Sequence, residues 1–322
     1  MRLRAGGIGL KRFLVGSTGF VGSNLMQETT FDGSFHSSDV QEAYGERPGL
    51  LVYAGVRAAK FLANRDEAAD WKQIASAMEN IERIAPAQLV LISTVDVYPQ
   101  PRGVDEESPI DLAAVQPYGK NRRKLELWVR EHFADALIVR LPALFGKHLR
   151  KNFLFDMVSL IPSMLTDAKY RELAAVSPLI ARSYERRDDG FFRCIVQAPA
   201  ERRALREAFL RVGFTALHFT DCRATYQFYD LAHLWRHIEI ALRAGISLLN
   251  LATEPLQASE IYAHVYQKEF RNELQGPVPH YDFRTVHADI FGGAGGYIFS
   301  KEQVLADIDR FLQRQADVTG RG

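Results

Sequence analysis

Three glycines at three-residue intervals constrain the fold of this chain more than any other feature. They lie in the run Gly16-Ser17-Thr18-Gly19-Phe20-Val21-Gly22, which follows an apolar segment at 13–15 and opens a helical pattern over 21–26. Glycine adopts backbone conformations closed to other residues and lets neighbouring backbone come close. The run therefore predicts a strand, a tight turn and the start of a helix.

The same turn predicts a site for phosphate groups. Gly16 lets the chain reverse, Gly19 lets the backbone approach a pyrophosphate, and Gly22 lets the helix pack near the strand. The phosphates would bind the free N–H groups at the positive end of that helix. We therefore expect a dinucleotide to be bound here by Gly16, Thr18, Gly19, Phe20, Val21 and Gly22.

Strand-like and helical segments alternate along the first half of the chain. Helical stretches separate most of the apolar runs, which lie at 13–15, around Phe35, and at 50–53, 89–93 and 137–141. The segment 66–84 carries a helical apolar stripe of Trp71, Ile74, Ala75, Met78 and Ile81, which we expect to face the core. The alternation predicts an α/β fold with a doubly wound parallel (Rossmann) sheet and ligands at the carboxyl ends of its strands.

The pattern changes after Gly146 and predicts a second, smaller α/β lobe. We expect helices at 149–162, 167–184 and 200–212 and strands at 191–197 and 216–220. A dinucleotide-binding domain would then comprise 11–147 with 225–253. A substrate-binding lobe would comprise 148–224 with 254–322.

Composition excludes several other classes of protein. A net charge of +1 argues against a nucleic-acid surface, and two cysteines with no Cys/His cluster argue against disulfides or a metal site. No apolar run approaches the ~20 residues of a membrane span. The leader Met1 to Lys11 is basic but lacks the apolar segment of a signal peptide. We expect no metal, no nucleic-acid partner, no membrane contact and a cytoplasmic location.

Two further segments carry chemistry. The run 93–98, Ser-Thr-Val-Asp-Val-Tyr, ends an apolar strand in hydroxyls and a carboxylate, and 117–122, Pro-Tyr-Gly-Lys-Asn-Arg, opens an amphipathic helix. With the glycine turn they resemble the extended short-chain dehydrogenase/reductase family, which comprises NAD(P)-dependent sugar-nucleotide epimerases, dehydratases and reductases. Matching segments at 54–56, 140–146, 226–230 and 250–252 follow in the family's order.

This resemblance implies an enzyme that acts on a nucleotide-linked sugar through transient hydride transfer. It implies that Thr94 hydrogen-bonds the reacting oxygen and that Tyr118 is the acid/base group. It also implies a homodimer formed through the helices that carry Met78 and Trp128. To the cofactor site it adds Ala54, Gly55, Val56, Ser93, Tyr118, Arg122, Leu141 and Pro142.

The chain departs from the family at Arg122, where a lysine is expected four residues after the tyrosine. Lys120 and Lys124 cannot replace that lysine, because at ~100° per residue they point away from the helix face of Tyr118. Arginine keeps the charge and can reach two ribose hydroxyls, but it does not take part in a proton relay. Two interpretations follow: a working enzyme, or a cofactor-binding sensor or scaffold without turnover.

Asp96 also has two interpretations. In the family's dehydratases the residues after the catalytic threonine are acids that move a proton at the sugar ring, and here they are Val95 and Asp96. Asp96 is therefore either a base at a carbon made acidic by transient oxidation, or a loop cap bound to backbone.

The choice of cofactor depends on the end of the second strand. If Asp39 binds the ribose, the cofactor is NAD; if Ser37 and Ser38 do so, NADP becomes possible, although no arginine is adjacent. NAD is favoured. By their positions after Gly146 or in the C-terminal loops, the candidates for substrate binding are Lys147, Asn152, Gln227, Arg284 and His287.

Overall fold

The computed structural model describes residues 11–320, the last five by their backbone alone. The leader Met1 to Lys11 therefore lies almost entirely outside the described residues. Among the residues that are described, no helix has the length and apolar composition needed to cross a bilayer.

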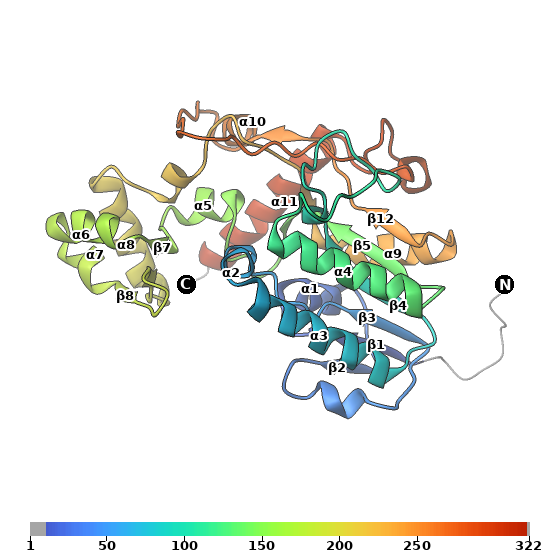
Figure 1. Cartoon of the computed structure of the whole chain (residues 1–322). Helices are drawn as coiled ribbons and strands as arrows, with labels where there is room; N and C mark the ends of the chain where they lie inside the picture. Colours follow the sequence, from blue (N-terminus) through green and yellow to red (C-terminus); the bar gives the residue numbers. More distant parts are fainter. Residues whose placement is uncertain (1–10, 321–322) are drawn as a thin grey trace. The chain divides into compact units, whose positions relative to one another are not determined.

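A six-stranded parallel sheet forms the centre of the first part of the chain (Figure 1). Its order is β12-β5-β4-β3-β1-β2, so the chain steps from β1 to β2 on one side and places β3 on the other. This reversal beside β1 is the topological switch point at which such sheets bind ligands. The predicted doubly wound fold is confirmed. The strands are β1 (Arg12–Val15), β2 (Gly33–Phe35), β3 (Leu50–Tyr53), β4 (Leu89–Thr94), β5 (Leu137–Leu141) and β12 (Leu248–Asn250).

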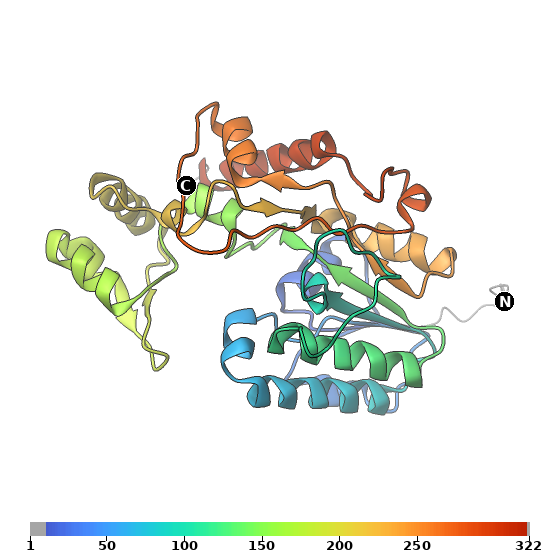
Figure 2. The same cartoon turned by 45° about the horizontal axis from the view of Figure 1, so that its top comes forward.

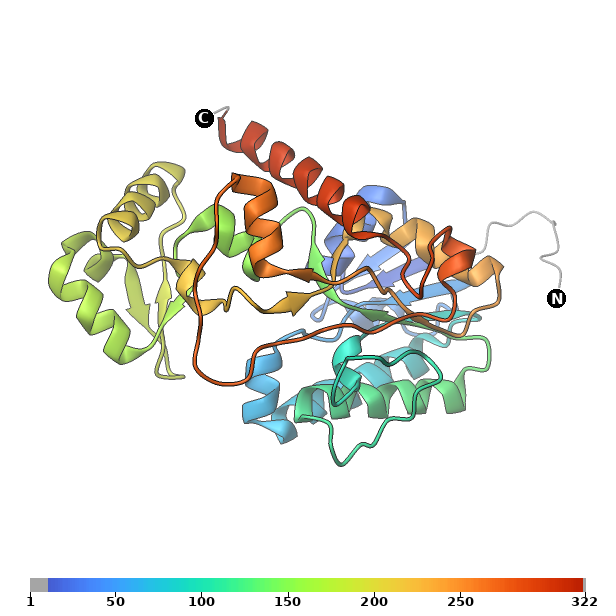
Figure 3. The same ribbon diagram turned by 90° about the horizontal axis from the view of Figure 1, so that it is seen from above.

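Helices cover both faces of this sheet. α3 (Glu67–Ile84) and α4 (Pro117–His132) pack on one face, and α1 (Phe20–Glu28) and α9 (Leu234–Arg243) pack on the other (Figure 3). Successive side chains of a strand point to opposite faces of the sheet and so into different cores. Leu51 belongs to the core under α3 and α4, and Val52 to the core under α1 and α9. Burial on both faces is why these strands are almost continuously apolar.

The buried face of α3 differs from the predicted stripe. Its buried residues are Asp70, Ile74, Ala77, Ile81 and Ile84, whereas Trp71 is 37% exposed and Ala75 lies on the exposed side. The prediction considered only apolar residues. The buried face that it gave is therefore rotated by about one residue from the buried face in the structure. Asp70 lies on the true face because it has a buried partner, described below.

The chain forms two compact units. The first comprises the residues up to His148, Gln227–Pro255 and Tyr281–Val304, and the second comprises Leu149–Tyr226, Leu256–His280 and the residues from Leu305. The first unit also holds α2 (Lys60–Arg65) and a parallel pair, β6 (Ala143–Phe145) with β11 (Phe228–Asp230). α11 (Lys301–Gly320) begins in the first unit and ends in the second. The predicted functional division into a dinucleotide domain and a substrate lobe stays a prediction.

The second unit contains a small antiparallel sheet of β7 (Met164–Leu165), β9 (Phe192–Cys194) and β8 (Tyr184–Arg186). It carries its own apolar core, formed by segments whose ribbons are drawn in yellow-green tones in Figure 2. The helices of that core are α6 (Asp167–Val176), α7 (Pro178–Arg182) and α8 (Pro199–Arg211). The unit also holds α5 (Phe153–Ser159), α10 (Ala258–Tyr266) and the antiparallel pair β10 (Thr225–Tyr226) and β13 (Leu256–Gln257).

Several predicted boundaries in this unit are wrong. The helix expected over 167–184 divides at Ser177, because Pro178 begins a new helix that Ser177 caps through Ile180 N–H. The strand expected over 216–220 is a 3₁₀ helix, Ala216–Phe219. Its start is fixed by a hydrogen bond from Thr215 N–H to His218 Nδ1 at 3.0 Å, a local contact that a strand would not make. The helix expected over 149–162 is confined to α5, and the strand expected over 191–197 to β9.

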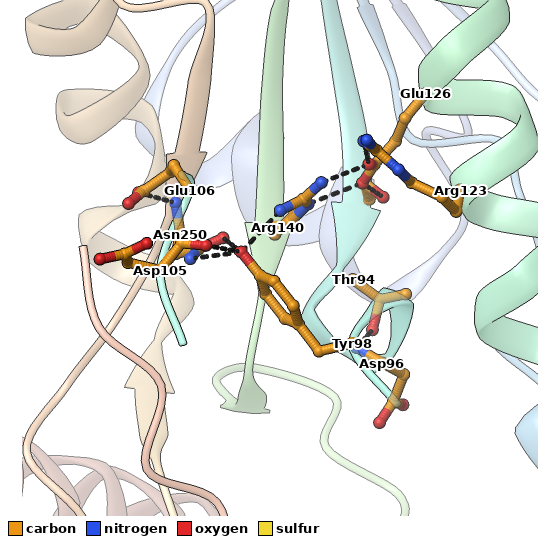
Figure 4. Close-up of polar contacts among 10 residues, drawn as sticks. Thr94, Asp96, Tyr98, Asp105, Glu106, Arg123, Glu126, Arg140 and Asn250 are labelled. Carbon is orange, nitrogen blue, oxygen red and sulfur yellow. Dashed lines mark hydrogen bonds and ion pairs between the residues drawn. The ribbon is translucent and has the colours of Figure 1, made fainter. Parts of the chain in front are cut away.

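A buried polar network lies inside the first unit (Figure 4). The Glu126 carboxylate accepts hydrogen bonds from Arg140 Nη2 at 2.6 Å, Arg123 Nη1 at 2.8 Å and the Ser93 hydroxyl at 2.6 Å. Burial alone would raise the pKa of Glu126, but Arg140, Ser93 and Arg123 together hold that pKa below its ordinary value. Arg140 Nη1 continues the network by donating to the Tyr98 hydroxyl at 2.7 Å. The network ties α4 to β4 and β5.

We expect Glu126→Gln to lower the free energy of unfolding by about 3 kcal/mol, because it leaves buried arginine charge without its partner. Urea denaturation near neutral pH measures this loss. Since the pKa is lowered in the folded state, the contribution of Glu126 is complete above its unfolded pKa and is lost as the pH falls through the folded one.

Glu79→Gln is the matched control, since Glu79 pairs with Arg83 on the exposed side of α3. It should change stability by less than about 0.5 kcal/mol. Equal stabilities of Glu126→Gln and Glu79→Gln would contradict a structural role for the network.

Candidate active site

The glycine turn has the geometry that its sequence predicts at two of the three glycines. Gly16 has a φ of +95°, and a Cβ on it would collide with the carbonyl of Ala54. A Cβ on Gly22 would collide with the carbonyl of Gly16. The turn is also held to β2, because Gly16 N–H donates to the carbonyl of Phe35 at 2.8 Å. Gly16 and Gly22 are thus needed by the fold itself.

Gly19 differs from the other two glycines. Its φ of −74° suits any residue, and a Cβ on it would meet only the Gly16 carbonyl oxygen, at 3.2 Å. It caps α1, so the N–H groups of Phe20, Val21 and Gly22 lie in the first turn, where a helix offers them no backbone partner. Apart from that oxygen and the chain neighbours of Gly19, no atom lies within 4 Å of the Cβ position, so the space over Gly19 is largely open and lies at the positive end of a helix.

The turn after β2 is closed by its own side chains. Asp39 Oδ1 accepts from His36 N–H at 2.6 Å, and its other oxygen lies 2.9 Å from His36 Nε2. The Ser38 hydroxyl lies 2.8 Å from His36 Nδ1. Ser37, Ser38 and Asp39 thus lie where the sequence places them, next to the carboxyl end of β2, with Asp39 pairing to His36.

The remaining predicted cofactor residues end neighbouring strands at the same edge. Ala54, Gly55 and Val56 follow β3, whereas Leu141 ends β5 and Pro142 follows it. Ser93 is the exception, because its hydroxyl points inward and donates to Glu126. Any cofactor contact of Ser93 would have to use its other atoms.

Thr94 and Tyr118 meet at this edge. Thr94 is the last residue of β4 and Tyr118 the second of α4, and the Thr94 side chain lies close enough to the Tyr118 hydroxyl to affect its ionisation. Tyr118 is 7% exposed, and burial raises the pKa of its hydroxyl above the ordinary value. Arg122, Lys60 and Thr94 act to lower that pKa, and Asp96 acts to raise it further. A buried hydroxyl with this much charge around it is the strongest candidate for proton transfer in the unit.

Arg122 lies on the face of Tyr118, as its spacing predicts, with its guanidinium carbon 3.9 Å from the ring centroid. Its Nη1 is 2.5 Å from Asp70 Oδ2 and also donates to the Tyr118 carbonyl at 3.1 Å. Its Nη2 donates to the carbonyl of Arg57 at 2.8 Å. Both nitrogens are thus engaged by the protein, and the ion pair with Asp70 is 5% exposed on each side. The predicted contact of Arg122 with a ribose stays a prediction.

Asp96 forms side-chain pairs that the sequence did not predict. Its Oδ1 accepts from Lys60 Nζ at 2.8 Å and from the Tyr281 hydroxyl at 3.1 Å, while its N–H donates to Thr94 Oγ1 at 3.2 Å. The Asp96 carboxylate is therefore bound by side chains, whereas the carboxylate of a loop cap would be bound by backbone N–H groups. Lys60 and Tyr281 are 36 and 185 residues away from Asp96, so no local pattern reveals them.

The predicted substrate residues are scattered. Gln227 is 1% exposed and its amide binds the carbonyls of Thr253 and Phe283, so it is not brought to the Tyr118 group. Lys147 lies against α1, with Nζ 3.1 Å from Gln27 Oε1. Arg284 is exposed beside Tyr297, and His287 precedes a 3₁₀ turn. Asn152 caps α5 in the second unit by accepting from Phe155 N–H.

No group of His, Cys, Asp or Glu side chains in the described part of the chain could hold a metal ion. The titratable residues at the sheet edge are instead Tyr118, Asp96 and Lys60, which can hold or move protons. The arrangement favours proton transfer beside a bound phosphate-containing ligand.

Solved structures share this architecture. A dTDP-4-dehydrorhamnose reductase from Bacillus anthracis in complex with NADP superposes with a TM-score of 0.63 at 15% identity, over 96% of this chain and all of that one. The Bordetella bronchiseptica enzyme WbmG in complex with NAD and UDP gives 0.61 at 12% identity, over 96% and 95% of the two chains.

UDP-glucose 4-epimerase from Thermotoga maritima with UDP-glucose gives a TM-score of 0.56 at 12% identity, over 94% of this chain and 99% of that one. No protein-family model and no curated protein sequence matches the chain. At these identities the likeness shows the fold. The expected resemblance is thereby confirmed at that level: the chain has the fold of the extended short-chain dehydrogenases/reductases.

Proposed function

We propose that the chain is an NAD(P)-dependent enzyme that reduces, epimerises or dehydrates a nucleotide-linked sugar, with Tyr118 as its acid/base group. The observation that carries this proposal is that Thr94 and the buried Tyr118 lie together at the sheet edge where the glycine turn also lies. The similar structures with NADP, NAD, UDP and UDP-glucose support the proposed ligand class.

The glycine turn fits a dinucleotide. The open space over Gly19 admits a pyrophosphate close to the backbone, and the N–H groups of Phe20 to Gly22 can donate to it. Asp39, next to the end of β2, suits the ribose hydroxyls of NAD, whereas binding through Ser37 and Ser38 would suit NADP. When bound, the dinucleotide supplies or accepts a hydride at its nicotinamide ring.

The chain's own residues would transfer the proton that accompanies the hydride. Tyr118 donates its hydroxyl proton to a carbonyl oxygen that is being reduced, or removes the proton from a sugar hydroxyl that is being oxidised. Thr94 hydrogen-bonds the same oxygen and orients it. The buried Arg122 guanidinium, stacked on the Tyr118 ring, favours the tyrosinate that donation leaves behind.

Asp96 is proposed as a base for reactions at the sugar carbon next to the oxidised position. Its Oδ1 already pairs with Lys60 and Tyr281, so the carboxylate is held in one orientation beside Thr94. Such an acid would be needed by a dehydratase and not by a simple reductase.

A second function, a sensor or scaffold that binds the cofactor without turnover, is favoured by one observation. Arg122, which stands where the family has a lysine, is held by Asp70 and two carbonyls and cannot relay a proton. Cofactor binding without turnover in both wild type and Arg122→Lys, across a broad panel of nucleotide sugars, would select this second function.

Other elements of the proposal rest on the resemblance. They include a cytoplasmic homodimer formed through the helices of Met78 and Trp128. A substrate lobe would take part through Asn152, and Lys147, Arg284 and His287 would contribute from the first unit. Gln227 is proposed only as a support for the segments that it joins, through Thr253 and Phe283.

Gly19→Val tests the dinucleotide site. The φ at Gly19 suits any residue and a Cβ there would meet only the Gly16 carbonyl oxygen, at 3.2 Å. The fold should therefore survive with a small local shift, but the side chain would fill the space that a pyrophosphate needs. Calorimetry should show the affinity for NAD and NADP falling by more than about 100-fold, or about 2.7 kcal/mol. Gly22→Ala is the contrasting variant and should lower the unfolding temperature, because its Cβ would collide with Gly16. Unchanged cofactor affinity in Gly19→Val would refute the site.

Tyr118→Phe tests the acid/base role. It removes the proton carrier while keeping the ring under Arg122, so turnover should fall by ~10²-fold or more with cofactor binding retained. Tyr44→Phe is the control, because Tyr44 lies near the C-terminal end of α3, away from Tyr118. Its hydroxyl donates to Asn80, and the N–H of the following residue, Gly45, donates to the carbonyl of Arg83. Turnover in Tyr118→Phe equal to that in Tyr44→Phe would exclude the tyrosine mechanism.

A further inference from the structure

The short helix α2 carries two residues on one face that bind the surroundings of Tyr118. Asn64 Oδ1 accepts the N–H of Tyr118 at 2.9 Å, at the end of α4 where backbone donors lack helical partners. Lys60 lies four positions earlier, which places it on the same face of α2. Its Nζ is 2.8 Å from Asp96 Oδ1 and 3.2 Å from the Tyr281 hydroxyl.

Lys60, Asp96 and Tyr281 form a closed group, because the Tyr281 hydroxyl also binds Asp96 Oδ1, at 3.1 Å. The three residues come from α2, from the turn after β4 and from the segment that begins at 281. The Asp96 side chain is 20% exposed and that of Lys60 is 47% exposed. A structural ion pair of this exposure contributes little to stability, so its position is more informative than its strength.

The backbone places this group directly beside Tyr118. A Cβ on Gly119 would collide with the carbonyl of Asp96, so the Asp96 turn rests on the first turn of α4. Asp96 N–H also donates to Thr94 Oγ1, and the Thr94 side chain lies beside Tyr118. The carboxylate and the tyrosine hydroxyl therefore share one small space.

Each of the two cations that act on Tyr118 is paired with a carboxylate. On α4 and α3, Arg122 pairs with Asp70 at 2.5 Å. On α2 and the turn after β4, Lys60 pairs with Asp96. Asp96 by itself opposes ionisation of Tyr118, because a carboxylate raises the pKa of a neighbouring phenol, whereas Lys60 lowers that pKa. Without Lys60, the charge of Asp96 on Tyr118 would be opposed by Arg122, which is already paired with Asp70.

We propose that Lys60 is a positioning residue of this site, which neutralises Asp96 and so allows Tyr118 to release its proton. The inference rests on the proposed acid/base role of Tyr118 and adds a residue from outside the helix where the family carries its lysine. In this arrangement two cations favour ionisation of Tyr118: Arg122 stacks on the tyrosine ring, and Lys60 offsets the charge of the Asp96 carboxylate.

The ionisation of Tyr118 can be measured without substrate or cofactor. The tyrosinate absorbance near 295 nm is recorded against pH for each variant and for the same variant carrying Tyr118→Phe, and the difference isolates Tyr118. Removing an opposite charge at this range should change its ionisation constant by about tenfold. Lys60→Met should lower the constant, and Lys60→Arg should restore it.

Asp96→Asn should increase the ionisation constant, which brings the titration of Tyr118 to lower and more accessible pH. Adding Lys60→Met to Asp96→Asn should then lower the constant again, back toward that of the wild type. Lys72→Met, which removes an exposed lysine of α3, is the matched control and should leave it unchanged. If Lys60→Met changes nothing in either background, the proposal is overturned.

This experiment separates the new inference from the proposed function. If no nucleotide sugar turns over but the titration of Tyr118 responds to Lys60 as described, the proposed function fails and the electrostatic role of Lys60 stands. If the enzyme is active and its kcat–pH profile is the same in Lys60→Met and Lys72→Met, Lys60 has no role through Tyr118.

Discussion

The site depends on a stripe of polar residues that α4 buries against the rest of the first unit. Tyr118, Arg122 and Glu126 are spaced four residues apart and so lie on one face of the helix. All three are buried, and burying a charge without a partner is costly. Each therefore requires a partner from another element: Thr94 from β4, Asp70 from α3, and Arg140 from β5.

These pairings determine where the tyrosine lies. α4 can bury its polar face only if α3, β4 and β5 present their partners at the right height along the helix. Once Glu126 is bound by Arg140 and Ser93, and Arg122 by Asp70, the first turn of α4 lies at the carboxyl edge of the sheet. There Tyr118 meets Thr94, close to the strand end that leads into the glycine turn. The buried ion pairs thus hold Tyr118 at the carboxyl edge of the sheet beside Thr94.

Local signals in the sequence predicted the strands, the glycine turn and the helix face on which this arrangement is built. The apolar runs gave the five strands from β1 to β5, because strands buried on both faces are almost continuously apolar. The glycine turn was also predictable, since its constraints are a positive φ at Gly16 and a close contact at Gly22. Spacing alone placed Arg122 on the face of Tyr118, where the structure has it.

The partners of the charged residues were not predictable in the same way. Asp70 carried a signal, since it lies four residues before Ile74 on the buried face of α3, but an apolar count passes over a carboxylate. Lys60 and Tyr281 carried none, because they reach Asp96 only through tertiary packing of α2 and of the segment after 280. For the same reason Gln227, a plausible substrate ligand by position, is a buried support.

In the proposed function, this edge of the sheet brings a nicotinamide and a sugar together for hydride transfer, and Tyr118 donates or accepts the proton. The most direct measurement uses reduced NAD or NADP labelled with deuterium at the reactive carbon, a panel of nucleotide-linked keto sugars, and mass spectrometry of the sugars. Hydride transfer at this site predicts one deuterium in a sugar product with the wild-type protein. Bound dinucleotide with no deuterium in any sugar would contradict it.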